Sequence, residues 1–367
     1  MSGASAAVVD APHAPFVLQN VEVAGLSGDE VRIKIAAVGV CHTDLGARAG
    51  AFPTQLPAVL GHEGTGTVLE VGSAVTHVTA GDRVALSYDS CGHCPTCATG
   101  STPYCREFLP RNFLAARLDG STAFSRDGDP LGSHFFGQSS FATETISPAR
   151  SVVRIDSEIP FEVLAPFGCS VQTGAGAVMR SLRPPAGSAI AIFGVGGVGM
   201  SAVLAAQIVG CATIIAVDLH PDRLALAAEL GATHVINGAE TDPVEKIASL
   251  TGAGADFALE CTGVPPVLAQ AVLSLAPTGR CGVVGAPPFG TTAEIDVNAV
   301  LSMGRRIQGI VEGDSLVAQF IPQLVEFWRQ GRLPVERFIT TFDFDQINDA
   351  VAQAESGVAV KPVLRVA

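Results

Sequence analysis

Four cysteines are clustered near the end of the first third of the chain. Cys91, Cys94, Cys97 and Cys105 have the spacing C-x2-C-x2-C-x7-C. Four thiolates that converge from one short loop supply the tetrahedral ligand set of a structural zinc ion. An iron–sulfur cluster uses the same number of cysteines, usually at other spacings. The cluster predicts a metal that stabilises a loop, and it says nothing by itself about catalysis.

A second set of metal-type side chains is dispersed along the chain. Cys41 begins the run Cys-His-Thr-Asp, His62 precedes a glutamate, and Cys169 stands far from both. Two cysteines and one histidine form a known catalytic zinc set, which leaves the fourth position open for water or substrate. No local spacing unites these three residues. Taken alone, they leave open that His62 is an ordinary histidine and Cys169 a buried thiol.

A glycine pattern indicates a dinucleotide site. Gly194, Gly196 and Gly199 form G-x-G-x-x-G between an apolar strand-like run at 189–193 and a helix-like run at 200–209. In this context the glycines allow a tight turn, close approach of a pyrophosphate, and close packing of helix on strand. Asp218 ends the next predicted strand. Its carboxylate can accept hydrogen bonds from the adenosine ribose and repels a 2′-phosphate, which favours NAD over NADP. The alternative is a glycine-rich turn followed by an ordinary aspartate.

These residues need two different kinds of scaffold. The first 165 residues or so are rich in predicted β-strands. Residues 30–40 alternate, with Val31, Ile33 and Ile35 on one face and charged residues on the other, and shorter strands are predicted at 61–71 and 82–86. This pattern predicts a small antiparallel barrel or sandwich with long loops.

After Pro166 predicted strands and helices alternate. Strands are predicted at 189–193, 214–218, 233–236, 257–260 and 280–284, with helices at 200–209, 221–230 and 265–275. Such alternation predicts a doubly wound parallel sheet. The tail holds predicted helices at 317–330 and 345–356 and a strand at 362–366, and we expect it to return to the first domain.

Length and composition agree with a globular, two-domain protein. The 367 residues are 48% hydrophobic and 16% charged, and 22 basic against 35 acidic side chains give a net charge of -13. An acidic chain of this kind disfavours nucleic acid and anionic membranes as partners. Residues 184–217 carry no charge and are long enough to span a bilayer, but a glycine cluster between two strand-like runs favours a buried βαβ unit.

The expected compartment is the cytoplasm. The opening residues MSGASAAVVDAPHAPF lack the basic and apolar regions of a signal peptide. The nine cysteines are therefore interpreted as metal ligands or reduced thiols and not as disulfides.

With these motifs in place, the chain resembles the medium-chain, zinc-dependent alcohol dehydrogenases over nearly its whole length. The resemblance rests on GVCHTD (39–44), GHEGTGTVLEVG (61–72), GDRVAL (81–86), CGHCPTC (91–97) with Cys105, and GVGGVGM (194–200). GQSSFA (137–142) and VEGDS (311–315) are most similar to the bacterial benzyl-alcohol, aryl-alcohol and geraniol dehydrogenases.

The resemblance implies roles for individual residues. Cys41, His62 and Cys169 would hold the catalytic zinc, Asp44 would orient His62, and Glu63 would lie behind the metal. Thr43 would hydrogen-bond the substrate hydroxyl. The expected cofactor-binding residues are His42, Thr173, Gly194, Gly196, Gly197, Val198, Gly199, Asp218, Arg223, Val284 (with Gly285 and Ala286) and Lys361. Among these, His42 and Lys361 would meet the pyrophosphate, while Thr173 and Val284 would flank the nicotinamide.

The implied reaction is reversible oxidation of a primary alcohol to its aldehyde. Zinc would lower the pKa of the alcohol, and the zinc alkoxide would release hydride to C4 of the nicotinamide. The proton would leave through Thr43 and the cofactor ribose. Well-known members of the family carry a histidine five residues after the first cysteine ligand as the terminal base, but this chain has Gly46 there. A water, His42 or another group must take that role.

The resemblance also implies an architecture and a pocket. We expect a GroES-like catalytic domain with both zinc sites at 1–170, a Rossmann NAD-binding domain at 171–310 and a return to the catalytic domain at 311–367. The active site is expected in the cleft between the domains. The expected assembly is a homodimer or homotetramer. Two zinc ions and NAD are the expected cofactors, and a small alcohol or aldehyde is the expected partner.

The predicted pocket residues are Phe52, Ser87, Phe135 and Phe136. Adjacent residues on a strand face opposite ways, so only one of Phe135 and Phe136 is expected to face the zinc. Aromatic walls beside a small serine predict an aryl or allylic alcohol.

Three alternatives stay open. Within the enzyme class, the chain could be a glutathione-dependent formaldehyde dehydrogenase or a polyol dehydrogenase. From another class, it could be a zinc-stabilised protein that binds NAD without turnover.

Overall fold

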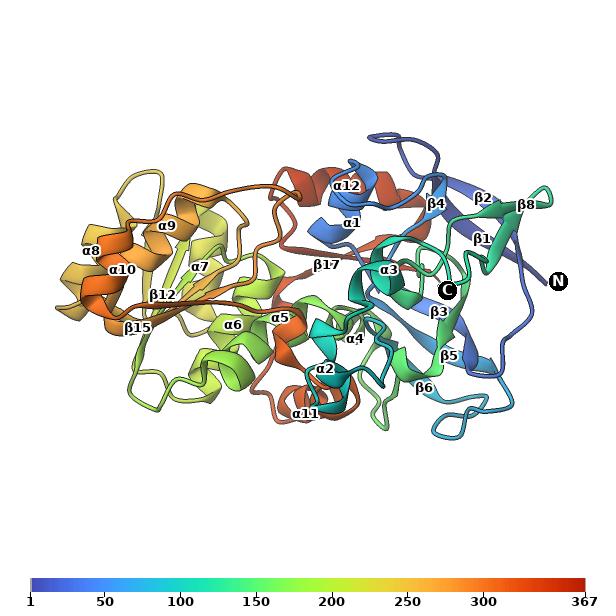
Figure 1. Ribbon diagram of the computed structural model, residues 1–367, viewed down its shortest axis with the longest axis horizontal. Coiled ribbons are helices and arrows are strands. Elements are labelled where there is room, and N and C mark those ends of the chain that lie inside the picture. The colour runs from blue at the N-terminus through green and yellow to red at the C-terminus, as the bar shows by residue number, and fades with distance from the viewer. Residues whose placement is uncertain (1, 367) are drawn as a thin grey trace. The chain divides into compact units, whose positions relative to one another are not determined.

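The computed structural model describes residues 2–366, which divide into two compact units (Figure 1). The first unit comprises residues 2–169, 316–329 and 339–366, and the second comprises residues 170–315 and 330–338. The sequence assigned 311–315 and 330–338 to the returning tail, and for both segments this is wrong. Leu333 and Val335 are fully buried in the second unit, and Arg337 pairs with Glu229 of that unit at 2.6 Å.

The first unit is built on two largely antiparallel sheets. One has the strand order β4-β1-β2-β7-β8, and the other has the order β10-β6-β5-β3-β18-β17 with β9 also paired to β3. The strands of the first sheet are β1 (Ser2–Val9), β2 (Val17–Val23), β4 (Ala58–Val59), β7 (Phe124–Arg126) and β8 (Asp129–Leu131). Those of the second are β3 (Glu30–Gly39), β5 (Gly64–Val71), β6 (Arg83–Leu86), β9 (Glu144–Pro148), β10 (Val152–Arg154), β17 (Ile339–Asp343) and β18 (Lys361–Arg365).

Strand β3 lies inside the second sheet, where it pairs with β5, β9 and β18. Along its first half, buried residues alternate with more exposed ones. Val31, Ile33 and Ile35 are fully buried on the core face, as the alternation predicted. On the other face Arg32 donates to Glu144 of β9 at 2.8 Å. The last strand, β18, pairs with β3 in antiparallel register, so the C-terminal segment does return to this unit.

Short helices of the first unit are inserted between its strands. They are α1 (His42–Arg48), α2 (Pro95–Ala98), α3 (Phe108–Phe113), α4 (Phe161–Leu164), α11 (Val317–Arg329) and α12 (Ile347–Glu355). Helix α1 follows β3 directly, and α2 and α3 lie on either side of the last cysteine of the four-cysteine loop, residues 91–105.

The second unit is a six-stranded, all-parallel sheet of order β13-β12-β11-β14-β15-β16. Its strands are β11 (Ala189–Phe193), β12 (Thr213–Asp218), β13 (His234–Asn237), β14 (Ala255–Glu260), β15 (Leu275–Val283) and β16 (Arg306–Gly309). Its helices are α5 (Ser170–Gly176), α6 (Gly197–Ile208), α7 (Pro221–Glu229), α8 (Pro243–Thr251), α9 (Pro265–Leu273) and α10 (Val297–Met303). Helix α6 begins earlier than predicted because the last glycines of the fingerprint already form its first turn.

Both faces of this sheet are covered. Ala191 and Phe193 pack with Ile247 of α8 and Ala271 of α9, and the intervening Ile192 is also fully buried. This double burial accounts for the uncharged stretch 184–217, which forms β11, α6 and β12. Within residues 2–366, no helix has the length and apolar character that crossing a membrane requires.

Candidate metal and dinucleotide sites

The carboxylate of Asp44 organises the dispersed ligand set. It lies in the first turn of α1 and is fully buried. One oxygen accepts from the backbone N–H of Cys41 at 3.0 Å, and the other accepts from Gly61 N–H at 3.0 Å and from Nδ1 of His62 at 2.8 Å. Three donors from two separate segments therefore share one carboxylate, which fixes where the Cys41 and His62 side chains stand.

The His62 imidazole is prepared to bind a metal through one nitrogen. Because Nδ1 is held by Asp44, Nε2 is the available ligand atom, and within the described part of the chain this buried atom has no hydrogen-bond partner. Burial disfavours the imidazolium, but the Asp44 carboxylate outweighs that cost and raises the pKa of His62 well above its usual value. A metal would take the place of that proton on Nε2.

The glycine before His62 is required by packing. Gly61 has a φ of 89°, and a Cβ added there would lie 2.5 Å from the backbone nitrogen of Phe141. Any other residue would be strained and would push the His62 loop away from its neighbours.

The structure brings Cys169 to the same place. It follows the 3-10 turn η4 (Ala165–Gly168), and the Ser87 hydroxyl of the β6 end donates to the carbonyl of Gly168 at 2.6 Å. One ligand atom each from Cys41, His62, Glu63 and Cys169 lies within 4.8 Å of all the others. The pKa of Cys41 lies well below its usual value, chiefly because the Cys169 thiol donates a hydrogen bond to it. Burial opposes this shift in pKa, and His62 adds to it. Two thiols and one imidazole fit a zinc ion with an open fourth position.

Glu63 and Lys361 form a buried ion pair beside these ligands. Lys361 is only 3% exposed, and its Nζ lies 2.5 Å from Oε2 of Glu63 and donates to the carbonyl of Val40 at 3.1 Å. Burial opposes the charge on Lys361, but Glu63 outweighs it and raises its pKa. The ammonium is thus bound inside the first unit, and its role toward a pyrophosphate stays a prediction.

Thr43 and His42 stand on the first turn of α1. The Thr43 hydroxyl lies 3.9 Å from the sulfur of Cys41, and His42 is exposed. Thr43 therefore lies beside the ligand set, and its hydrogen bond to a substrate hydroxyl stays a prediction.

Phe135 and Phe136 both lie against His62. Phe136 stacks on the imidazole with ring centres 4.6 Å apart, and Phe135 meets it edge-on at 5.7 Å. The expectation that the pair lies on a strand is wrong, because the segment is a short 3-10 turn, η2 (Phe135–Gly137). Which of the two rings faces a zinc ion stays a prediction. Left-handed backbone at His134 (φ 70°) and Phe136 (φ 52°) turns both rings the same way.

Phe52 occupies the space beside Gly46. A Cβ on Gly46 would lie 2.6 Å from Cε2 of the Phe52 ring. The chain therefore has an aromatic ring packed over the position where relatives place a histidine, and no side chain fits there unless Phe52 moves. Phe52 also packs on Phe113 at 5.0 Å, a contact that the sequence did not reveal.

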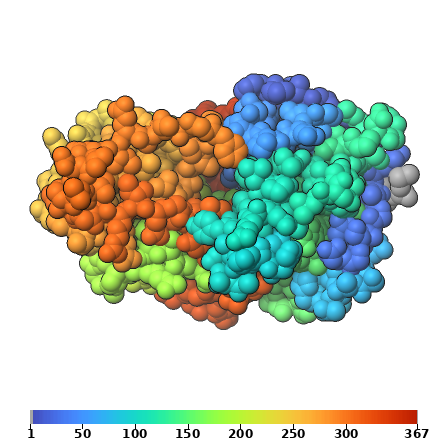
Figure 2. Space-filling view, viewed as in Figure 1, coloured from blue at the N-terminus to red at the C-terminus, as the bar shows by residue number. Residues whose placement is uncertain are grey.

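The four-cysteine loop forms a second ligand set in the first unit. Sulfur atoms of Cys91, Cys94, Cys97 and Cys105 lie within 4.8 Å of one another. A hydrogen bond from the Thr96 hydroxyl lowers the pKa of Cys94 to about 5, while burial raises the pKa of Cys97 to about 12. Four cysteine sulfurs so close together fit a structural zinc ion, whose charge would hold all four as thiolates. Figure 2 shows this turquoise segment, around residue 100, at the surface.

The glycine fingerprint lies at the carboxyl end of β11. Gly194 has a φ of 84°, and a Cβ on Gly199 would lie 2.0 Å from the carbonyl oxygen of Gly194. Gly196 caps α6 and has open space above it, with Arg223 Nη1 4.0 Å from a Cβ placed there. Gly197 and Val198 form the first turn of α6. A half-buried helix N-terminus with an arginine nearby fits a pyrophosphate.

Asp218 stands at the end of β12, as predicted. Its carboxylate accepts from the backbone N–H groups of Val195 at 2.8 Å, Leu219 at 2.7 Å and His220 at 3.0 Å. These bonds tie the fingerprint turn to the next strand and keep the negative charge in place for a ribose.

Thr173 belongs to a buried polar cluster that the sequence did not predict. The Thr173 hydroxyl and the Gln172 amide donate to Glu312 at 3.4 and 3.1 Å, and Glu312 has a φ of 48°. The only hint in the sequence was the acidic residue that directly follows the apolar pair Ile310-Val311. Val284 directly follows β15, where its N–H donates to the carbonyl of Glu260 at 2.9 Å.

Comparison with known proteins gives two family matches. Residues 27–157 match the alcohol dehydrogenase GroES-like domain, and residues 197–328 match the zinc-binding dehydrogenase domain. The chain is 45% identical to a geraniol dehydrogenase of Castellaniella defragrans over 98% of this chain and 97% of that protein.

Solved structures agree with these matches. A zinc-binding alcohol dehydrogenase domain protein from Burkholderia ambifaria is 50% identical, with a TM-score of 0.98 over 100% of this chain and 99% of that one. Benzyl alcohol dehydrogenase from Acinetobacter calcoaceticus is 44% identical, with a TM-score of 0.97 over 100% of both chains.

The Asp44 geometry generates a prediction about metal binding. Asp44→Asn replaces one acceptor oxygen by an amide and removes the charge that orients His62. We expect zinc affinity at the Cys41–His62–Cys169 site to fall by about 10- to 100-fold. Titration with a competing chelator measures this, with the exposed Asp129→Asn as the control. Equal zinc retention in Asp44→Asn and the unmodified chain would contradict the role assigned to Asp44.

Proposed function

The chain belongs to the zinc-binding alcohol dehydrogenase family, and from this premise we propose that it reversibly oxidises a primary aromatic or allylic alcohol to its aldehyde with NAD. The observation that carries the proposal is the convergence of Cys41, His62 and Cys169 beside stacked phenylalanines. The chemistry supplied by zinc at such a site is Lewis acidity, which lowers the pKa of an alcohol hydroxyl.

The proton and the hydride of the alcohol would leave by different routes, each formed by residues of this chain. The Thr43 hydroxyl is suited to accept the alcohol proton because it lies next to the ligand Cys41. Gly46 offers no base behind it, and Phe52 fills the space, so the proton must leave by water or through the exposed His42. The hydride from the carbinol carbon would reduce the nicotinamide, which Thr173 and Val284 would flank.

The aromatic side chains favour the proposed substrate class. Phe136 and Phe135 pack on His62, and Phe52 and Phe113 continue the same group of rings. A flat, conjugated alcohol gains from contact with aromatic rings and from apolar burial of about 25 cal/mol per Å2. The named activities of the geraniol and benzyl alcohol dehydrogenases fit the same class.

A homodimer or homotetramer is supported by an apolar surface on the second unit. Strand β16 is an edge strand and exposes Ile307, and the preceding helix α10 exposes Val297, Leu301 and Met303. An exposed strand edge beside apolar side chains is suited to pairing with a second copy. We also propose that the enzyme works in a reducing compartment, the cytoplasm, because none of its nine cysteines forms a disulfide and six of them belong to the two predicted zinc sets.

The substrate proposal is tested by comparing alcohols directly. We expect kcat/KM for benzyl alcohol and geraniol to exceed that for ethanol by at least about 100-fold, since ethanol leaves the aromatic surface without a partner. Absorbance at 340 nm with NAD measures each rate. A ratio near one, or a preference for ethanol, removes the aryl and allylic assignment.

We further expect two zinc ions per chain with separate tasks. Cys94→Ser should lose one zinc and lower the free energy of unfolding, because the open loop keeps uncompensated thiolates. Cys169→Ser should lose turnover and keep its fold. Cys211→Ser, a buried thiol outside both sets, is the matched control and should keep both ions. Metal analysis that finds one zinc in the unmodified chain contradicts the two-site proposal.

The preference for NAD is assigned to Asp218. Asp218→Asn keeps a side chain of the same shape and removes the charge, so discrimination against the 2′-phosphate of NADP should fall by about tenfold or more. Asp218→Gly should in addition weaken NAD, because the bonds to Val195 and Leu219 are lost. The measurement is kcat/KM for each cofactor. Comparable values for NAD and NADP in the unmodified enzyme would show that Asp218 does not exclude NADP.

A further inference from the structure

The helix that follows the four-cysteine loop is held by its own buried polar contacts. Asn112 of α3 is fully buried; its Oδ1 accepts from Asp89 N–H at 2.8 Å, and its Nδ2 donates to the Asp89 carbonyl at 2.9 Å. The same Nδ2 lies 2.7 Å from the carbonyl of Phe108. The side chain of Asn112 thus pairs with the backbone of Asp89 as a strand neighbour would, which fixes the end of α3.

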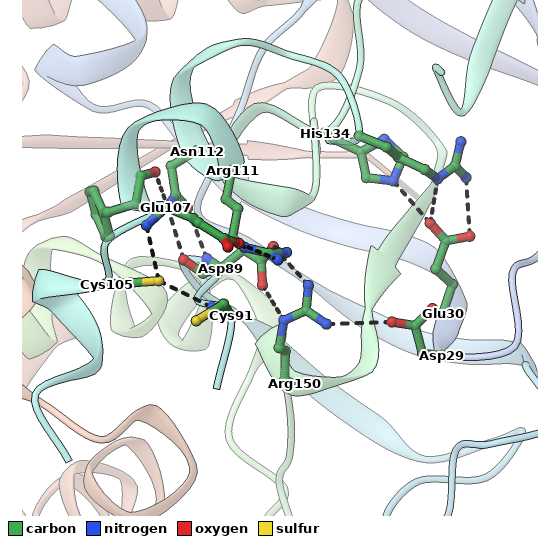
Figure 3. A network of polar contacts seen from close by, with 12 residues as sticks. Asp29, Glu30, Asp89, Cys91, Cys105, Glu107, Arg111, Asn112, His134 and Arg150 are labelled. Atoms are coloured by element: carbon green, nitrogen blue, oxygen red, sulfur yellow. Dashed lines mark hydrogen bonds and ion pairs between the residues drawn. The ribbon is translucent and has the colours of Figure 1, made fainter. Parts of the chain in front are cut away.

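Two arginines complete this arrangement, called here the Asp89 cluster (Asp89, Arg111, Asn112 and Arg150). Arg150 donates to the two Asp89 oxygens at 2.6 and 3.0 Å, and Arg111 donates to one of them at 3.2 Å (Figure 3). Arg111 also binds Glu107 at 2.7 Å. Asp89 is only 3% exposed, so its charge depends on these partners.

The cluster is continuous with the cysteine loop. The N–H groups of Cys91 and Glu107 both donate to the sulfur of Cys105, at 3.2 and 3.4 Å (Figure 3). Glu107 precedes α3 and binds Arg111 within it. The four-cysteine loop and α3 are therefore joined through backbone and side-chain bonds and should move as one body.

Phe113, the last residue of α3, contacts the aromatic rings near His62. Its ring centre lies 5.0 Å from Phe52, 5.1 Å from Phe136 and 6.2 Å from Phe135. Phe136 in turn stacks on His62 at 4.6 Å. Phe135 and Phe136 are buried, whereas Phe113 and Phe52 are only half-buried and keep surface that a ligand can cover.

We propose that Phe113 is a specificity-determining residue for the alcohol and that the Asp89 cluster positions it. The four-cysteine loop then fixes the shape of the substrate site as well as stabilising the chain. This inference rests on the proposed function, since it concerns the same aromatic and allylic alcohols. A zinc-bearing loop is well suited to the task because its geometry changes little when a substrate binds.

The test compares two Phe→Leu variants of the zinc-loaded enzyme. Phe113→Leu keeps apolar volume and removes the ring. Phe344→Leu makes the same change in the core of the first unit, outside the group of rings around Phe113. We expect the ratio of kcat/KM for benzyl alcohol over ethanol to fall about tenfold in Phe113→Leu, mainly through KM, and to stay unchanged in Phe344→Leu.

A second variant tests the positioning. Arg111→Met keeps the aliphatic stem and loses the bonds to Asp89 and Glu107, so it should lower the same ratio by a few-fold while the bound zinc stays at its unmodified content. An unchanged ratio in folded Phe113→Leu overturns the role of Phe113, and equal losses in both Phe→Leu variants reduce it to general packing. A ratio near one in the unmodified enzyme has a different meaning: it overturns the substrate proposal itself, and this inference with it.

Discussion

A buried carboxylate needs hydrogen-bond donors around it. In the first unit the fully buried carboxylate of Asp44 meets this need, and the metal-ligand set is arranged around it. Asp44 takes hydrogen bonds from Cys41, Gly61 and His62, and bonds to a charged acceptor are worth about 1.5–3 kcal/mol each. Because the donors come from the α1 loop and the β4–β5 loop, satisfying the charge also sets the distance between the two ligands. It further selects the nitrogen that His62 can offer to a metal. The glycine at 61 follows from the same demand, since its backbone must reach both Asp44 and Phe141.

The rest of the site follows from how the remaining space is filled. Lys361 neutralises Glu63 from the last strand, so that pairing β18 with β3 also delivers a cation to the metal site. The space around Gly46 and His62 is filled by the aromatic rings of Phe52, Phe135 and Phe136. Phe52 lies over Gly46, so the position where the family resemblance implies a basic histidine is covered by an aromatic ring in this chain. The proposed preference for aromatic and allylic alcohols and the missing histidine would then have one cause, the Phe52 ring.

What could be predicted from the sequence is what local spacing encodes. The four cysteines, the glycine fingerprint and the alternation in β3 each lie within one short segment, and the structure places each as expected. Cys169 has no such signal, and only resemblance to a family connected it with Cys41 and His62. The turn at Phe135 and Phe136 was expected to be a strand, because a left-handed φ at a non-glycine residue has no signature in the sequence. Glu312 and residues 330–338 depend on partners more than 100 positions away, Gln172 and Glu229.

The two units use different parts of the residue to build their sites. In the second unit the backbone does the work: glycines clear space, a helix N-terminus faces outward, and Asp218 holds the turn through three backbone N–H groups. Side chains add to this, since Gln172 and Thr173 donate to the buried Glu312. In the first unit side chains do the work, and each must be aimed by another, as Asp44 aims His62 and as Asn112 aligns the helix that carries Phe113. In the first unit a series of contacts runs from Arg111 in α3 through Phe113 and Phe136 to His62. A change at Arg111 is therefore expected to shift the aromatic rings, while the hydrogen bonds of Asp44 keep Cys41 and His62 in place.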